Sequence, residues 1–132
     1  MVNDLEVVQD ATQDFVIANH FIEHCQNPIG ALQNMLRVLK PGGKLYLSIP
    51  DKRYTFDMDR PITSVDHVTK DYVEGPEWSK RKHFEEWVTS VNKAKDFAEA
   101  EKQVADLVAE TTASTITSGR KLRCSSFFFV WV

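Results

Sequence analysis

Residues 14–51 read DFVIANHFIEHCQNPIGALQNMLRVLKPGGKLYLSIPD, and this stretch decides the fold. Residues 14–19 form a short apolar run rich in β-branched and aromatic side chains, which is typical of a buried strand. Residues 44–50 have the same character and predict a second buried strand. A helix is expected between them, near residues 28–40. Two strands that are joined by one helix run parallel, with a right-handed crossover.

The predicted helix has recognisable ends and one apolar face. Asn27 is expected to cap its start through the side-chain oxygen, and Pro28 suits the first position because no N–H is needed there. The Pro-Gly-Gly turn at residues 41–43 is expected to end the helix, since glycine adopts the left-handed conformation easily. Apolar residues at three- and four-residue spacing give the buried face: Ile29, Leu32, Leu36 and Leu39.

Further helices are expected in the second half of the chain. Thr63 or Ser64 is the expected N-cap of a helix that the Gly-Pro pair at residues 75–76 interrupts. Residues 77–110 then follow a helical pattern. A bend is expected near residues 90–92, because Ser and Asn side chains compete with the helix backbone for hydrogen bonds.

The composition indicates one soluble domain. The chain has 132 residues, of which 42% are hydrophobic and 27% are charged. The formal net charge of −3 argues against a nucleic-acid-binding surface. No apolar run has the length of a membrane span, and the N-terminus lacks a signal-peptide pattern. We therefore expect a cytoplasmic protein that binds neither nucleic acid nor membranes. Two cysteines, Cys25 and Cys124, make neither a metal pattern nor a disulfide framework.

Two motifs in the opening stretch resemble a known family. The polar cluster NHFIEH at residues 19–24 and the turn RVLKPGG at residues 37–43 are similar to parts of class I S-adenosylmethionine-dependent methyltransferases. The segment PDKRYTFD at residues 50–57 extends the similarity to the type 11-like group, up to about Val91. The resemblance covers the C-terminal half of that domain.

The resemblance implies an α/β fold. We expect a partial Rossmann-like, doubly wound parallel sheet within residues 1–110, with a helical insertion at residues 64–110. In the family, an earlier glycine-rich loop approaches the cofactor, and the sequence contains no Gly-x-Gly pair that would allow this approach. We therefore expect a fragment of a longer enzyme that is inactive alone and whose own binding of S-adenosylmethionine is doubtful.

The resemblance also implies roles for particular residues. The cofactor would be contacted by Asn19, His20 and Ile22. His20 would act as the catalytic base if the methyl acceptor is a hydroxyl group. The acceptor, a small or sugar-like molecule, would be bound by the polar residues Glu23, His24, Asp51, Arg53, Arg60 and His67.

The carboxyl ends of parallel strands share one edge of the sheet, so His20, Asp51 and Arg53 are expected to meet there. Structural alternatives remain open for the polar residues: Glu23 and His24 would brace the loop, and residues 51–60 would form a solvated loop with local ion pairs. His67 would be a structural histidine. No metal site is predicted, because three ligands within five positions, as in His20, Glu23 and His24, rarely complete a coordination shell.

An alternative function is a non-catalytic, methyltransferase-like module. An exposed sheet edge offers unpaired N–H and C=O groups to another chain. This alternative predicts self-association, and S-adenosylmethionine binding distinguishes it from the enzyme hypothesis.

Residues 111–132 are expected to form an irregular tail. They lack helical periodicity and end in the apolar run FFFVWV. With freely chosen codons, one base inserted after the Thr111 codon converts the tail into a His-x-His-Val-Trp strand and an amphipathic helix, which resemble the family's continuation. We hypothesise a one-base deletion that placed the tail out of frame.

Overall fold

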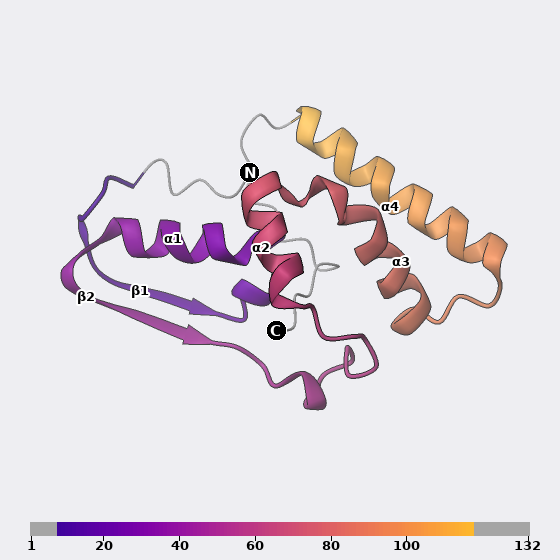
Figure 1. Cartoon of the computed structure of the whole chain (residues 1–132), viewed down its shortest axis with the longest axis horizontal. Coiled ribbons are helices and arrows are strands. Elements are labelled where there is room, and N and C mark those ends of the chain that lie inside the picture. The colour runs from indigo at the N-terminus through magenta and orange to yellow at the C-terminus, as the bar shows by residue number, and fades with distance from the viewer. Residues whose placement is uncertain (1–7, 118–132) are drawn as a thin grey trace.

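The computed structural model describes residues 8–117, and the side chains of residues 8–110. The strands and α-helices occur in the order β1 (Gln13–Asn19), α1 (Pro28–Val38), β2 (Leu39–Ser48), α2 (Val65–Glu74), α3 (Lys80–Ser90) and α4 (Phe97–Thr117) (Figure 1). Three short 3₁₀ helices connect them: η2 (Ile22–His24), η3 (Lys52–Tyr54) and η4 (Pro76–Trp78). Within the described range, no helix combines the length and apolar character that crossing a bilayer requires.

The two strands form a parallel sheet, which confirms the predicted α/β class. β1 pairs with β2 from Phe15 opposite Lys44 to Asn19 opposite Ser48. The ladder continues one residue further, because the N–H of His20 donates to the carbonyl of Ser48 at 2.9 Å. α1 lies along the strands (Figure 1). The arrangement is consistent with part of a Rossmann-like methyltransferase fold.

Only one face of this sheet is shielded from solvent. Side chains that face one way from the strands, such as Val16 and Leu45, are half-buried. On the opposite face Phe15, Ile17 and Tyr46 are 65%, 59% and 61% exposed. The expectation that both strands are buried is therefore wrong for this face. The apolar runs alone could not show this exposure, because they indicate which side chains favour burial and not whether another element covers them.

β2 begins at Leu39, and not near residue 44 as predicted. α1 ends at Val38, so the helix is two residues shorter than expected. Gln13 pairs with Leu39 and Phe15 pairs with Lys44, so the Pro-Gly-Gly turn forms an irregular bulge inside the strand. Gly42 has a φ of +82° there, which favours glycine. The turn therefore shapes the strand instead of capping the helix.

The buried face of α1 is rotated by one position from the predicted one. The predicted N-cap is confirmed, because the side chain of Asn27 accepts a hydrogen bond from the N–H of Gly30 at 2.9 Å. Leu36 is nevertheless 57% exposed. The helix carries two neighbouring apolar stripes, and its packing partners decide which of them is buried. The buried residues of α1 are Pro28, Ala31, Met35 and Val38.

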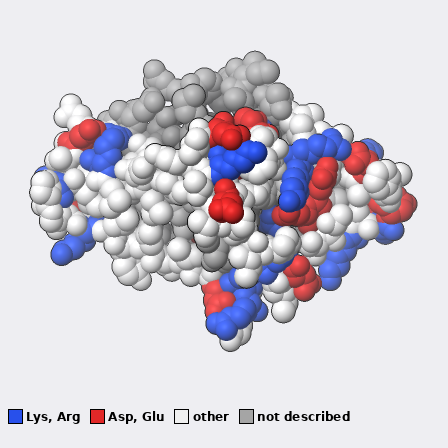
Figure 2. Space-filling model, in the orientation of Figure 1, with Lys and Arg blue, Asp and Glu red and all other residues white. Residues whose placement is uncertain are grey.

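The second half of the chain is helical, as predicted, with one break. The Oγ of Ser64 caps α2 by accepting from the N–H of His67 at 3.2 Å. α3 and α4 pack side by side as a helical hairpin, and the break between them, residues 91–96, is longer than the predicted bend. In Figure 2 charged side chains gather over these helices, whereas the face over α1 and the strands is mostly uncharged.

The described residues form two separate hydrophobic clusters. The larger one lies within the α3–α4 hairpin and contains Phe84, Val88 and Val104. The smaller one joins η2 to α1 and contains Ile22, Cys25 and Ala31. Cys25 is therefore a buried packing residue.

The irregular tail was predicted to begin at residue 111, which is too early because α4 extends to Thr117. α4 continues through residues 111–117, whose sequence showed no helical period. Backbone helicity can extend past the last well-packed turn, because each added residue gains a hydrogen bond once a helix has started. Residues 118–132, and with them Cys124, lie outside the described range.

Candidate functional site

A pocket opens at the carboxyl ends of the two strands, where the first polar loop leaves the sheet. We call it the strand-end pocket; its volume is about 590 Å³. Apolar side chains from η2, α1 and α2 form its wall, and a charged segment after β2 forms its rim. The lining residues are Ile22, Pro28, Ile29, Leu32, Ile49, Pro50, Asp51, Lys52, Arg53, Ile62 and Val68. Pockets at this end of parallel strands are where α/β sheets bind ligands.

Asp51 and Arg53 form a close ion pair on the rim. The Nε of Arg53 donates to Oδ1 of Asp51 at 3.0 Å, and Nη2 donates to Oδ2 at 2.5 Å. The backbone N–H of Arg53 also donates to Oδ1 and so caps η3. These bonds from Arg53 lower the pKa of Asp51 to about 2, and the same pairing raises the pKa of Arg53. At neutral pH the rim therefore presents an ionised carboxylate beside a guanidinium.

His20 follows β1 in a strained backbone conformation. Its φ is +50°, a value that costs residues other than glycine free energy and that recurs at functional sites. The exposed imidazole lies with Nδ1 3.6 Å from Oε1 of Glu23. Nε2 of His24 is 4.0 Å from the same oxygen. Glu23 thus stands between two imidazoles.

The carboxylate of Glu23 is almost fully buried. Its side chain is 1% exposed, and neither of its oxygens has a hydrogen bond within the described part of the chain. Burying a charged group without hydrogen bonds is costly, and such groups are common where a ligand completes the site. Glu23 and the two histidines form one polar cluster near the sheet edge.

The structure places the residues predicted from the sequence in two different regions. Ile22, Asp51 and Arg53 line the strand-end pocket. His20 leaves the same end of the sheet, but it does not line that pocket. Asn19, opposite Ser48 in the ladder, is exposed.

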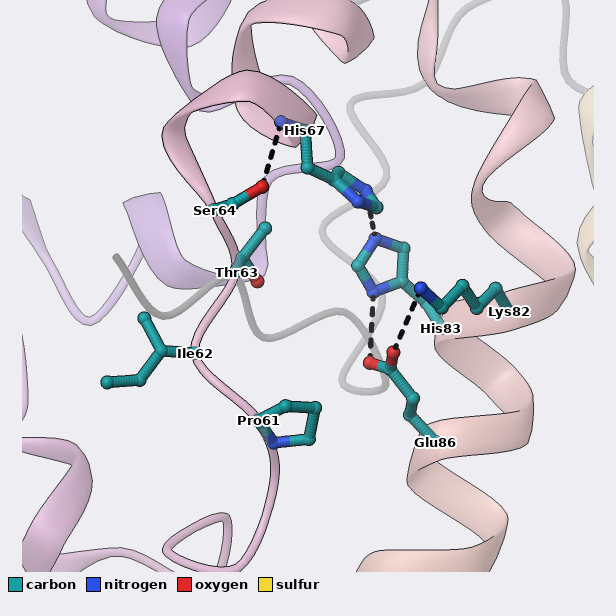
Figure 3. A pocket seen from close by; sticks show the side chains of 8 residues that line it. All are labelled: Pro61, Ile62, Thr63, Ser64, His67, Lys82, His83 and Glu86. Atoms are coloured by element: carbon teal, nitrogen blue, oxygen red, sulfur yellow. Dashed lines mark hydrogen bonds and ion pairs between the residues drawn. The ribbon is translucent and has the colours of Figure 1, made fainter.

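Arg60 and His67 belong to the second region, which comprises the helical insertion and the loop before it. The guanidinium of Arg60 is 2% exposed, and it pairs with Asp57 at 3.4 Å and with Glu86 at 3.9 Å. Its charge is therefore engaged inside the protein and not on the rim of the strand-end pocket. His67 points toward His83 on α3 (Figure 3).

His67 lies in a cluster with Asp71 and His83 that was not predicted from the sequence and that we call the insertion cluster. Nε2 of His67 lies 3.1 Å from Nε2 of His83 and 3.3 Å from Oδ2 of Asp71. The four-residue spacing of His67 and Asp71 was the available signal, because it places both on one face of a helix. His83 comes from another helix, so no sequence spacing could bring it to the other two.

The insertion cluster is buried enough to shift its pKa values. Burial, and then the neighbouring His67, lowers the pKa of His83 to about 4. Burial also raises the pKa of Asp71, although a hydrogen bond from Ser79 opposes this shift. A small pocket of about 170 Å³ borders the cluster (Figure 3). At neutral pH His83 is therefore a neutral imidazole.

Fold and site together define the class. A parallel β-α-β unit with a ligand-sized pocket at its strand ends is typical of Rossmann-like domains. A family model described as a methyltransferase domain matches residues 2–107. The chain therefore belongs to the methyltransferase domain family, and it is a class I, S-adenosylmethionine-dependent methyltransferase-like domain. Neither a curated protein nor a solved structure matched it.

Proposed function

We propose that the chain contributes one side of the active site of a methyltransferase that uses S-adenosylmethionine and a small-molecule acceptor. The strand-end pocket, which lies at the strand ends of a methyltransferase-family domain, is the observation that carries this proposal. Its apolar wall and charged rim match the usual design of small-molecule sites, in which a few polar groups orient a mostly apolar ligand.

The residues of the first loop fit the cofactor by their chemistry. Ile22 offers an apolar surface in the pocket wall, and Glu23 offers a buried carboxylate without hydrogen bonds among the described residues. A carboxyl group in this position is a suitable partner for a cationic ligand. When bound, S-adenosylmethionine supplies a methyl group on a positively charged sulfur. Asn19, at the strand end, would add a polar contact.

The rim and the histidines would serve the acceptor. Asp51 is ionised at neutral pH and so accepts hydrogen bonds from hydroxyl groups, as on a sugar-like molecule. Arg53 keeps it oriented. His20 would remove the proton of a reacting hydroxyl, with Glu23 beside its Nδ1 to favour the protonated imidazole that results. Of the other predicted acceptor contacts, His24 lies beside Glu23 in the same loop, whereas Arg60 and His67 lie away from the strand-end pocket.

We further propose that the chain alone is inactive. Among its five glycines no two are spaced as Gly-x-Gly. A loop of that kind lets the backbone approach a nucleotide closely, since any side chain would intervene. We therefore expect weak cofactor binding, with a Kd of about 100 µM or higher, which is on the order of −5 kcal/mol.

Isothermal titration of the full chain with S-adenosylmethionine tests both statements. We expect weak binding that Glu23→Gln abolishes, because the substitution removes the carboxyl group but keeps the shape of the side chain. Glu74→Gln, on an exposed glutamate of α2, is the matched control and should bind like the unmodified chain. Absence of any binding would refute the cofactor proposal. Tight binding would refute the expected weak affinity, and methyl transfer from labelled cofactor by the chain alone would refute the inactivity.

A second candidate function is a module that associates with a second copy of itself. The observation that favours it is the exposed apolar face of the sheet, formed by Phe15, Ile17 and Tyr46. Apolar side chains grouped on one face gain free energy when another surface covers them. Concentration-dependent association without any cofactor binding would favour this function over the enzyme.

A further inference from the structure

The insertion cluster brings three metal-binding side chains to one point between α2 and α3. One ligand atom from each of His67, Asp71 and His83 lies within 4.8 Å of the other two. Two imidazoles and one carboxylate are a ligand set that Zn²⁺ accepts in proteins. We propose that these three residues bind a transition-metal ion of the Zn²⁺ type.

The distances suit a small tetrahedral ion. With metal–nitrogen and metal–oxygen bonds of about 2.0–2.1 Å, neighbouring ligand atoms of a tetrahedron are about 3.3 Å apart. The two distances from Nε2 of His67, to His83 and to Asp71, are 3.1 Å and 3.3 Å. Two edges of such a tetrahedral face therefore already have nearly this spacing, and all three ligand atoms lie within 4.8 Å of one another. Larger ions such as Ca²⁺ require more oxygen ligands than this cluster offers.

The groups around the cluster orient its ligand atoms. Ser79 donates its hydroxyl proton to Oδ1 of Asp71 at 2.9 Å, which leaves Oδ2 toward His67. Glu86 lies with Oε2 3.9 Å from Nδ1 of His83, the ring nitrogen that faces away from the cluster (Figure 3). A carboxylate behind a metal-binding histidine fixes the ring and its tautomer. The Ser79–Asp71 hydrogen bond is the arrangement of an outer partner at a metal centre, and Glu86 lies on the side of His83 from which such a partner acts.

The site has room for a fourth ligand. The pocket of about 170 Å³ that borders it is lined by both histidines and by the loop before α2. Zinc sites with three protein ligands keep the fourth position for water or a bound molecule. The nearby cations, Arg60 and Lys82, are both within ion-pairing distance of Glu86, which offsets their repulsion of a metal ion.

The alternative is a hydrogen bond between the two imidazoles with no metal. In that arrangement one Nε2 carries a proton and donates it to the other. A metal bound by both Nε2 atoms instead requires the proton to sit on Nδ1 of each ring. The two arrangements therefore differ in a property that nuclear magnetic resonance measures directly, the tautomer of each histidine.

The test uses the full chain, stripped with a chelator and titrated with Zn²⁺ alone. Calorimetry should give one site per chain, and Co²⁺ in its place should give the intense visible bands of a four-coordinate ion. His67→Gln and Asp71→Asn should each weaken Zn²⁺ binding by about 100-fold or more, beyond the loss that an outer partner causes. Ser79→Ala should weaken it by about 10–100-fold.

A matched control replaces the two histidines of the first loop. The double variant His20→Gln/His24→Gln should bind Zn²⁺ like the unmodified chain. Circular dichroism of every variant checks folding, and the Co²⁺ spectrum and histidine tautomers of the unmodified chain need no variant. The proposal fails if the chain does not bind Zn²⁺, if His67→Gln binds it equally well, or if only the control variant loses it.

Discussion

At the scale of single residues, the rim of the strand-end pocket depends on the bonds from Arg53 to Asp51. These bonds lower the pKa of Asp51 to about 2 from its ordinary 3.8. The stabilisation is therefore present above pH 3.8 and is lost as the pH falls through about 2, because the protonated carboxyl no longer pairs.

We predict that Arg53→Gln returns the pKa of Asp51 toward 3.8. The carboxyl carbon resonance of Asp51 should then begin to shift at a higher pH in the variant than in the unmodified chain. Arg81→Gln, which removes a guanidinium on α3, is the control. A titration of Asp51 that Arg53→Gln leaves unchanged would mean that Arg53 does not hold the charge of the rim.

The conformation of His20 gives a second prediction at this scale. Its positive φ suits Asn and Gly but not a β-branched residue. His20→Asn should keep the free energy of unfolding within about 0.5 kcal/mol, whereas His20→Val should lower it by about 1–2 kcal/mol. Lys44→Val, at an exposed strand position, controls for the valine itself and should be nearly neutral. Denaturant unfolding measures all three, and equal stability of the two His20 variants would contradict the strain.

At the scale of elements, the cap of α1 is a local interaction that the sequence predicted correctly. Asn27→Ala should lower the free energy of unfolding by about 1 kcal/mol, because the N–H of Gly30 loses its acceptor. Asn27→Ser should retain most of that stability, since serine caps helices nearly as well. Thermal and denaturant unfolding test this. An alanine variant as stable as the serine variant would show that the cap contributes nothing.

The parallel β-α-β unit could be predicted from local signals such as caps and strand-forming runs. Features that depend on non-local packing could not be predicted. The buried stripe of α1 includes Met35 in place of Leu36, because its neighbours select the stripe. Gly42 was predicted to end the helix, but it lies in a bulge of β2. Local sequence could not predict this, because a bulge is defined only by the pairing of β2 with β1. In the candidate site, Asp51 and Arg53 were predictable from their place after a strand. His83 was not, because it meets His67 only through the packing of two helices.

At the scale of the whole molecule, the exposed sheet face predicts behaviour in solution. The double variant Ile17→Thr/Tyr46→Thr should associate less than the unmodified chain, because it removes two neighbouring apolar side chains from a face open to solvent. Sedimentation velocity over a range of concentrations measures this. Val73→Thr, at an exposed apolar position on α2, is the control and should leave association unchanged. A monomeric unmodified chain at all concentrations would contradict the prediction.

The division of the core into two clusters has a consequence for the local unfolding of the chain. Phe84, Val88 and Val104 come from two consecutive helices, α3 and α4, so the contacts of this hairpin are local in sequence. The cluster around Ile22 joins a different pair of segments. Cooperative units of this kind exchange their amide hydrogens with separate opening free energies. Amide exchange should therefore report ligand binding at each site separately. Zn²⁺ should slow exchange in α2 and α3, and S-adenosylmethionine should slow exchange in η2 and at the end of β1.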